Sequence, residues 1–135
     1  MPRVTVEILE GRKTEQKRAV VKGVCDSINE VFGSAKSNIA VRIAPIKPED
    51  LAVSGELLSD AGKDITALYG LGEPRITVQH VEGRSLDQRR QLAGLITDRV
   101  AQALALPKDR VAIYFLIAKL TELAGGGVLN IDNKK

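Results

Sequence analysis

An eleven-residue segment occurs twice in this 135-residue chain, with the two copies 72 residues apart. Residues 2–12 read PRVTVEILEGR and residues 74–84 read PRITVQHVEGR, with seven identical positions and no gap. Two of the other four positions exchange one apolar side chain for another. A repeat of this length indicates that the chain contains two copies of one structural unit. We therefore expect the two halves to fold alike and to pack against each other.

The pattern of apolar residues changes in the same order in both copies. In the first copy, Val4, Val6 and Ile8 alternate with polar residues, which is typical of a half-buried strand. Further along, apolar residues recur at helical spacing and predict an amphipathic helix. In the second copy, Ser85 and Gln88 form a capping-box pattern that marks the start of a helix. The expected elements are a strand over 3–8, a helix over 14–32, a strand over 39–43, a strand over 75–81, a helix over 85–104 and a strand over 110–116.

Each copy therefore has the order strand, helix, strand. The right-handed crossover rule makes the two strands of one copy parallel. We predict an α+β fold of two tandem β-α-β units, with a four-stranded sheet and both helices on one face. Because a unit of about 60 residues is marginal alone, each copy needs the other. The predicted boundaries are a first half over 2–58, a linker over 59–73 with a short strand or helical turn near 65–69, a second half over 74–129 and a polar, frayed tail over 130–135.

Charge and composition fit a small anionic ligand better than a nucleic acid, and a solvated basic surface accounts for the charge equally well. The net charge is +3, and aromatic residues make up 3% of the chain, without the stacking pattern of single-strand binders. We therefore expect no nucleic-acid partner. No apolar run approaches the roughly 20 residues of a membrane span, and the N-terminal residues do not resemble a signal peptide. We expect a cytoplasmic protein with no membrane partner.

The chain contains one histidine and one cysteine. His80 shares the strand parity of Ile76 and Val78, so we expect a packed side chain rather than a ligand. Cys25 excludes an intramolecular disulfide and a cysteine-rich zinc site, and we expect a small buried side chain. We expect no metal and no cofactor.

Proline begins both copies, but only Pro2 can carry a free amine. Methionine before a small residue such as proline is normally removed, and removal of Met1 would leave a secondary amine at Pro2. The nitrogen of Pro74 is locked in a tertiary amide, which is neither basic nor nucleophilic. The sequence thus offers one amine site per chain, held by a rigid ring.

Four short motifs resemble one known family. They are the proline after the initiator methionine, the Glu-Gly-Arg turn at 10–12, Glu-Gln-Lys at 15–17 and Ser-Gly-Glu-Leu at 54–57. Together they resemble the short subunits of 4-oxalocrotonate tautomerase (4-OT), without gaps over residues 2 to about 58, and the second half follows the pattern from 74 to about 129. A chain of double length resembles the fused members of the tautomerase superfamily, the group that includes cis-3-chloroacrylate dehalogenase.

The resemblance implies a β-α-β fold, a homotrimer of fused chains and catalysis by mature Pro2. In that family, the prolyl amine takes a proton from the 2-hydroxyl of a dienol acid and returns it to carbon, while arginines bind the substrate carboxylates. Arg12 matches the arginine of the family's turn, and Arg84 is its counterpart in the second half. As an alternative, both arginines could pair with the neighbouring Glu10 and Glu82.

Two other positions of the family's site differ in this chain. The family's second arginine falls on Ala40 and, in the repeat, on Ala112. Its aromatic loop residue falls on Leu51 and, in the repeat, on Leu123. These differences count against an efficient 4-oxalocrotonate tautomerase, but other side chains are available as replacements.

Arg42, Arg110 and Tyr114 are the candidate substrate-binding replacements. Arg42 lies two residues past Ala40, so strand alternation puts both on the same face. Arg110 and Tyr114 lie two residues before and after Ala112. Tyr114 also resembles a tyrosine that helps to position water in the fused dehalogenase. No carboxylate aligns with the additional acid of that enzyme, which counts against hydrolytic dehalogenation.

A prolyl base must be neutral to accept a proton. Nearby arginines and an apolar pocket would lower the pKa of the Pro2 amine, because both disfavour a second cation. We therefore predict an isomerase, an enol-keto tautomerase that acts on a small anionic 2-hydroxy-dienoate or enolpyruvate. Two alternatives stay open. One is a hydratase or 3-haloacrylate dehalogenase with Pro2 as an acid, and the other is a non-catalytic assembly partner.

Overall fold

The fold is a tandem repeat of the β-α-β unit, as predicted. The computed structural model describes residues 2–60 and 73–133, and the element expected near 65–69 lies outside these ranges. The main elements are β1 (Arg3–Leu9), α1 (Thr14–Phe32), β2 (Ala40–Ile46), β5 (Arg75–Val81), α2 (Leu86–Leu104) and β6 (Ala112–Ala118). Both helices and the first strand of each copy lie where the sequence predicts them.

The second strand of each copy begins later and ends later than predicted. In both copies a 3-10 turn precedes the strand, at Lys36–Asn38 and at Lys108–Arg110. β2 then continues to Ile46 because its parallel pairing with β1 extends to the last residue of that strand, Leu9. Pro45 is tolerated within β2 because this strand lies at the edge of the sheet.

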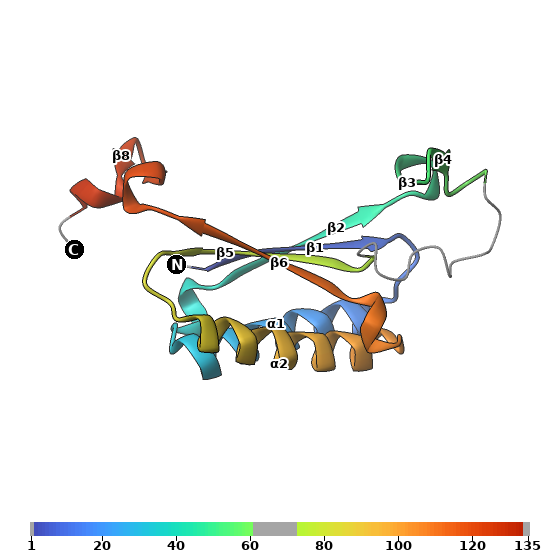
Figure 1. Cartoon of the computed structure of the whole chain (residues 1–135), viewed down its shortest axis with the longest axis horizontal. Coiled ribbons are helices and arrows are strands. Elements are labelled where there is room, and N and C mark those ends of the chain that lie inside the picture. Colours follow the sequence, from blue (N-terminus) through green and yellow to red (C-terminus); the bar gives the residue numbers. More distant parts are fainter. Residues whose placement is uncertain (1, 61–72, 134–135) are drawn as a thin grey trace.

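The four strands form one mixed sheet in the order β2-β1-β5-β6, and both helices cover the same face (Figure 1). β1 and β5 are antiparallel at the centre, and Thr5 pairs with Thr77, its own counterpart in the repeat. Between the helices, Arg99 Nη1 donates to Ser27 Oγ at 2.9 Å, and these two residues are also counterparts. A pseudo-two-fold axis therefore passes through both pairs.

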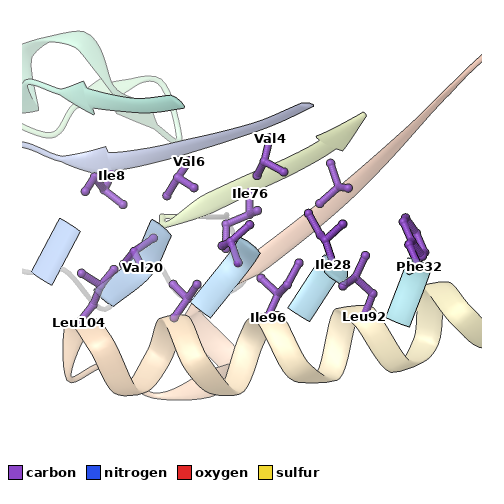
Figure 2. Close-up of a cluster of buried hydrophobic side chains, with 13 residues drawn as sticks. Val4, Val6, Ile8, Val20, Ile28, Phe32, Ile76, Leu92, Ile96 and Leu104 are labelled. Atoms are coloured by element: carbon purple, nitrogen blue, oxygen red, sulfur yellow. The ribbon is translucent and has the colours of Figure 1, made fainter. Parts of the chain in front are cut away.

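One hydrophobic core lies between the sheet and the two helices (Figure 2). Burying one such side chain contributes about 1.5 to 3 kcal/mol, so the core joins the two halves firmly. The strands supply the alternating residues of their inner face, and the helices supply one stripe each. The buried members are Val4, Val6, Ile8, Val20, Val24, Ile28, Phe32, Ile76, Val78, Leu92, Ile96, Val100 and Leu104.

The two helices begin with different caps. Ser85 Oγ accepts from the backbone N–H of Gln88 at 3.1 Å, and Gln88 Oε1 accepts from the N–H of Ser85 at 2.9 Å. This confirms the predicted capping box. At the start of α1, the N–H of Lys13 donates to Gln16 Oε1 at 3.0 Å. The return bond cannot form there, because a lysine ammonium group has no acceptor.

Two short hairpins extend beyond the sheet at opposite ends (Figure 1). They are β3 (Ala52–Val53) with β4 (Glu56–Leu57), and β7 (Ala124–Gly125) with β8 (Val128–Leu129). The tail predicted from residue 130 begins with a 3-10 turn, Asn130–Asp132, whose first N–H donates to Leu123 O at 2.7 Å. Over residues 2–60 and 73–133, no helix is both long and apolar enough to cross a bilayer.

Candidate active site

Pro2 lies buried at the start of β1. Its carbonyl oxygen accepts from Ala40 N at 3.3 Å and from Arg3 Nη1 at 3.1 Å. β1 and β5 are antiparallel, and Arg3 pairs with Gln79. The next position along this pairing sets His80 opposite Pro2. The turn that follows β5 therefore lies at the same end of the sheet as Pro2.

A cationic hollow of about 360 Å³ lies at this end of the sheet, with Arg3, Arg42 and Gln79 among its lining residues. Pro2 does not line it, but Arg3 and Ala40, which bond to the Pro2 carbonyl, do. Arg42 shares the sheet face of Ala40, as predicted, and pairs with Thr5 of β1. The other lining residues are Val4, Thr5 and Ala40, so none of the described residues that line the hollow carries a carboxylate. Two guanidinium groups without a neighbouring acid favour a small anion.

One difference between the copies leaves Arg3 available to this hollow. In the second half, Arg75 Nη2 donates to both carboxylate oxygens of Glu7, at 2.6 and 2.9 Å. The symmetric pair is Arg3 with Gln79, which carries no charge. Arg3 Nη1 donates instead to Pro2 O and to Asn38 O, the latter at 3.0 Å. The exchange of Glu7 for Gln in the second copy is visible in the sequence and could have identified Arg3.

His80 is packed between two phenylalanine rings, which confirms the prediction of a packed histidine. His80 is 3% exposed. The centroid of its ring lies 5.2 Å from that of Phe32 and 6.0 Å from that of Phe115. Nδ1 lies 2.8 Å from Val81 O, so the N–H of the neutral ring sits on Nδ1. Burial lowers the pKa of His80, and the positive charges of Arg89 and Arg84 lower it further. The imidazole is therefore neutral at pH 7.

Arg84 is held at this same end by the C-terminus of α1. Its Nη1 donates to Phe32 O at 2.8 Å, and its guanidinium carbon lies 4.7 Å from the centre of the Phe32 ring. The alternative ion pair with Glu82 is not formed among the described residues. Arg84, from the loop between β5 and α2, and Arg42, from β2, thus both lie at the Pro2 end of the sheet.

Arg12 and Arg110 lie at the opposite end, where both bind Glu73. Glu73 is 2% exposed and Arg110 is 3% exposed. Arg12 Nη2 lies 3.3 Å from Glu73 Oε1, and Arg110 Nη2 donates to Oε2. The prediction that Arg110 extends the strand before Ala112 is wrong. Arg110 ends a 3-10 turn, and its Nε donates to the backbone carbonyl of Glu73 at 2.9 Å.

Tyr114 and Cys25 lie apart from both ends. Tyr114 is exposed on β6, pairs with Thr77 and lies 5.6 Å from the guanidinium of Arg75. Cys25 is partly exposed on α1, so the prediction of a buried thiol is wrong. The structure therefore divides the predicted site. Pro2, Arg84 and Arg42 lie at one end, and Arg12 and Arg110 lie roughly 20 Å away along the seven residues of β1.

The tandem β-α-β fold recurs in solved structures of fused tautomerases. A wild-type fused 4-OT solved as an asymmetric trimer superposes with a TM-score of 0.82 over 98% of this chain and 99% of its own, at 16% identity. A member of the cis-3-chloroacrylic acid dehalogenase family superposes with a TM-score of 0.71 over 94% of this chain and 82% of its own, at 18% identity. At such identities the likeness establishes the fold.

Sequence comparison establishes the family. The family model described as tautomerase enzyme matches residues 2–61. The 2-hydroxymuconate tautomerase of Bacillus subtilis (strain 168) is 43% identical over 60 residues, which are 44% of this chain and 97% of that protein. The chain belongs to the tautomerase family, whose activity is that of an isomerase.

Proposed function

We propose that this tautomerase converts a small 2-hydroxy-dienoate or enolpyruvate to its keto form, with the amine of mature Pro2 as the general base. The observation that supports the proposal is the cationic hollow at the Pro2 end of the sheet, which is lined by Arg3 and Arg42 and by no carboxylate of the described chain. Pro74 has no such surroundings, because Glu73 precedes it and binds the arginines at that end.

The reaction moves one proton without a net change in atoms or electrons. The amine of Pro2 takes the proton of the 2-hydroxyl group, and the C2–O bond becomes a carbonyl. The electron pair of the carbon-carbon π system moves to C5 in a dienoate, where a C3=C4 double bond remains, or to C3 in an enolpyruvate. The prolyl ammonium group then returns the proton to that carbon. Arg42 and Arg84 bind the substrate carboxylate and the oxygen on which negative charge develops. The same charges favour the neutral amine.

We also propose a homotrimer. Large apolar side chains are exposed on β6 and on the hairpins at both ends of the sheet, where a second and a third copy of the chain would cover them. The fused 4-OT that superposes on this chain was solved as a trimer. The exposed apolar residues of β6, of the hairpins and of the 3-10 turns beside β7 and β8 are Leu57, Tyr114, Leu116, Ile117, Leu120, Val128, Leu129 and Ile131. Sedimentation equilibrium should give three times the chain mass, and a monomer would contradict the proposal.

The decisive experiment is the rate of ketonisation of 2-hydroxymuconate and of phenylenolpyruvate, followed by absorbance. The protein should first be shown by intact mass to begin at Pro2. We expect a rate above that of the buffer, and a loss of about 10² to 10⁴ in Pro2→Ala, the usual contribution of a positioned base. A Pro2→Ala protein that turns over at the full rate would refute the prolyl base.

Three arginine variants test how the substrate is bound. Arg84→Ala and Arg42→Ala should each lower kcat/KM about 10- to 100-fold, the cost of a hydrogen bond to a charged group. Arg90→Ala is the matched control, because Arg90 pairs with Asp87 on the exposed face of α2. Halide release from 3-haloacrylates should be absent, and its presence would favour the dehalogenase alternative.

A further inference from the structure

Glu73 is the most completely bound carboxylate of the described chain, and it lies outside the proposed active site. Oε1 accepts from the N–H of Leu9 at 2.8 Å and from Arg12 Nη2 at 3.3 Å. Oε2 accepts from Nη2 of Arg110. Nε of the same arginine donates to the backbone carbonyl of Glu73 at 2.9 Å. Both oxygens of one carboxylate thus receive bonds from two guanidinium groups and one backbone amide. These are the donors from which a carboxylate-binding site is built.

The repeat shows that this cluster is particular to the second half. Glu73 precedes Pro74 as Met1 precedes Pro2, so a carboxylate takes the place of an uncharged side chain. Arg110 has the uncharged Asn38 as its counterpart in the first half. Glu73 and Arg110 are thus two charged residues of opposite sign at positions where the first half is uncharged. Arg12 is common to the two halves, because its counterpart is Arg84. The second half therefore carries an acid together with an arginine that binds it, and the first half carries neither at the matching positions.

Charge and burial show what the cluster would do without Glu73. Arg12 and Arg110 contribute two positive charges, and Glu73 contributes one negative charge. The side-chain exposure is 15% for Arg12 and 3% for Arg110, so water cannot fully replace a missing carboxylate. An anion of the right size should bind in its place.

We propose that the Pro74 end of the sheet is a carboxylate-binding site which the chain fills with its own Glu73. Glu73 is an internal ligand, and its removal converts the cluster into a site for a small external carboxylate. Because Pro74 has no free amine, a ligand bound there undergoes no proton transfer. In the part of the chain that the structure describes, the wild type therefore has one carboxylate site open to substrate, at Pro2, and one that Glu73 occupies.

Glu73→Ala offers a direct test with acetate as the probe. This substitution deletes one methylene group and the carboxylate, so the gap has the size and charge of acetate. Thermal unfolding of the full-length protein should be followed in sodium acetate and in sodium chloride at equal ionic strength. We expect acetate to raise the melting temperature of Glu73→Ala by at least about 3 °C over chloride, the shift produced by a ligand well above its Kd. The wild type should show no such difference.

Two controls make the result specific. Glu7→Ala removes another arginine-bound carboxylate, but its pair with Arg75 is 27% and 41% exposed, so water can replace it and acetate should give no rise. Glu73→Gln fills the gap with a neutral group and should also be insensitive to acetate. Equal effects of acetate on Glu73→Ala and the wild type, or on Glu73→Ala and Glu7→Ala, would overturn the proposal.

The experiment also gives an answer if Glu73→Ala is unfolded in sodium chloride. In that case the circular dichroism of Glu73→Ala is measured as acetate replaces chloride. Recovery of the folded spectrum supports the internal-ligand site, and an unfolded spectrum at every acetate concentration overturns it. Neither measurement uses catalysis, so the outcome is independent of the role proposed for Pro2.

Discussion

The close approach of the two helices at Gly23 reverses the usual effect of a glycine-to-alanine substitution. Gly23 is buried on α1, and a Cβ atom added there would lie 2.9 Å from the Cβ of Arg99 on α2. Arg99 is held by bonds of 2.9 Å to Ser27 and 3.1 Å to Glu30. Because a Cβ atom is fixed by its backbone, rotation of the arginine cannot relieve the contact, and the helices must move apart.

Two opposing contributions set the change in the free energy of unfolding that Gly23→Ala should cause. Alanine in a helix interior is about 1 kcal/mol more favourable than glycine, whereas overpacking a close contact costs about 1 to 3 kcal/mol. Gly23→Ala should therefore lower the free energy of unfolding by about 0 to 2 kcal/mol. Gly94 on α2 is the matched control, since an added Cβ would have no atom within 4 Å. Gly94→Ala should raise the free energy of unfolding by about 1 kcal/mol.

Urea unfolding followed by circular dichroism measures the free energy of unfolding of both variants. All proteins should be compared at one concentration, because assembly affects apparent stability. Arg99→Ala keeps the Cβ atom and should leave the cost of Gly23→Ala unchanged. Arg99→Gly removes that atom and should abolish the cost. If Gly23→Ala stabilises the protein as much as Gly94→Ala does, the helices do not approach each other as described.

Three further predictions concern caps and titrating groups. Ser85→Ala should destabilise the protein by about 1 kcal/mol because it removes the acceptor of the capping box, and Lys13→Ser should have the opposite effect at the start of α1; urea midpoints test both. His80 is the only histidine and its pKa is lowered by burial, so the unfolded chain takes up the proton first as the pH falls. Stability should therefore be complete above about pH 6.5, the ordinary histidine pKa, and decline below it. His80→Ile, which copies Ile8, should remove that decline in urea midpoints measured from pH 7.5 to 5.5. Hydrogen bonds from Lys22 and Lys36 lower the pKa of Asp26 to about 2, so a carboxyl carbon titration by NMR should show Asp26 ionised at pH 3, and a midpoint near 4 would contradict these pairs.

The repeat made the architecture predictable from sequence. Identical spacing in two copies predicts equal elements, and the pairing of Thr5 with Thr77 follows once the two copies face each other. Local signals were also reliable where one residue decides the outcome. Ser85 with Gln88 predicts the start of α2, and Gly33, with a φ of 70°, ends α1 in the left-handed conformation.

The site was less predictable because its contacts are not local. Arg110 binds Glu73, which lies 37 residues earlier, and alternation along a strand carries no information about such a partner. The sequence places Glu73 in the predicted linker over 59–73. An isolated acid directly before Pro74 was the available signal, because the repeat aligns it with Met1. The hairpins were missed as well, although Ser54 and Gly55, both with positive φ, are typical turn residues.

Covalent linkage of the two halves frees the positions on the pseudo-two-fold axis to differ. In a symmetric dimer of separate units, a residue on the axis meets its own copy, so an arginine at that place would face another arginine. In this chain Arg99 meets Ser27 and bonds to Glu30, which no symmetric pair allows. Duplication followed by fusion therefore lets each half evolve under its own selection, so that one half can specialise in chemistry while the other specialises in stability.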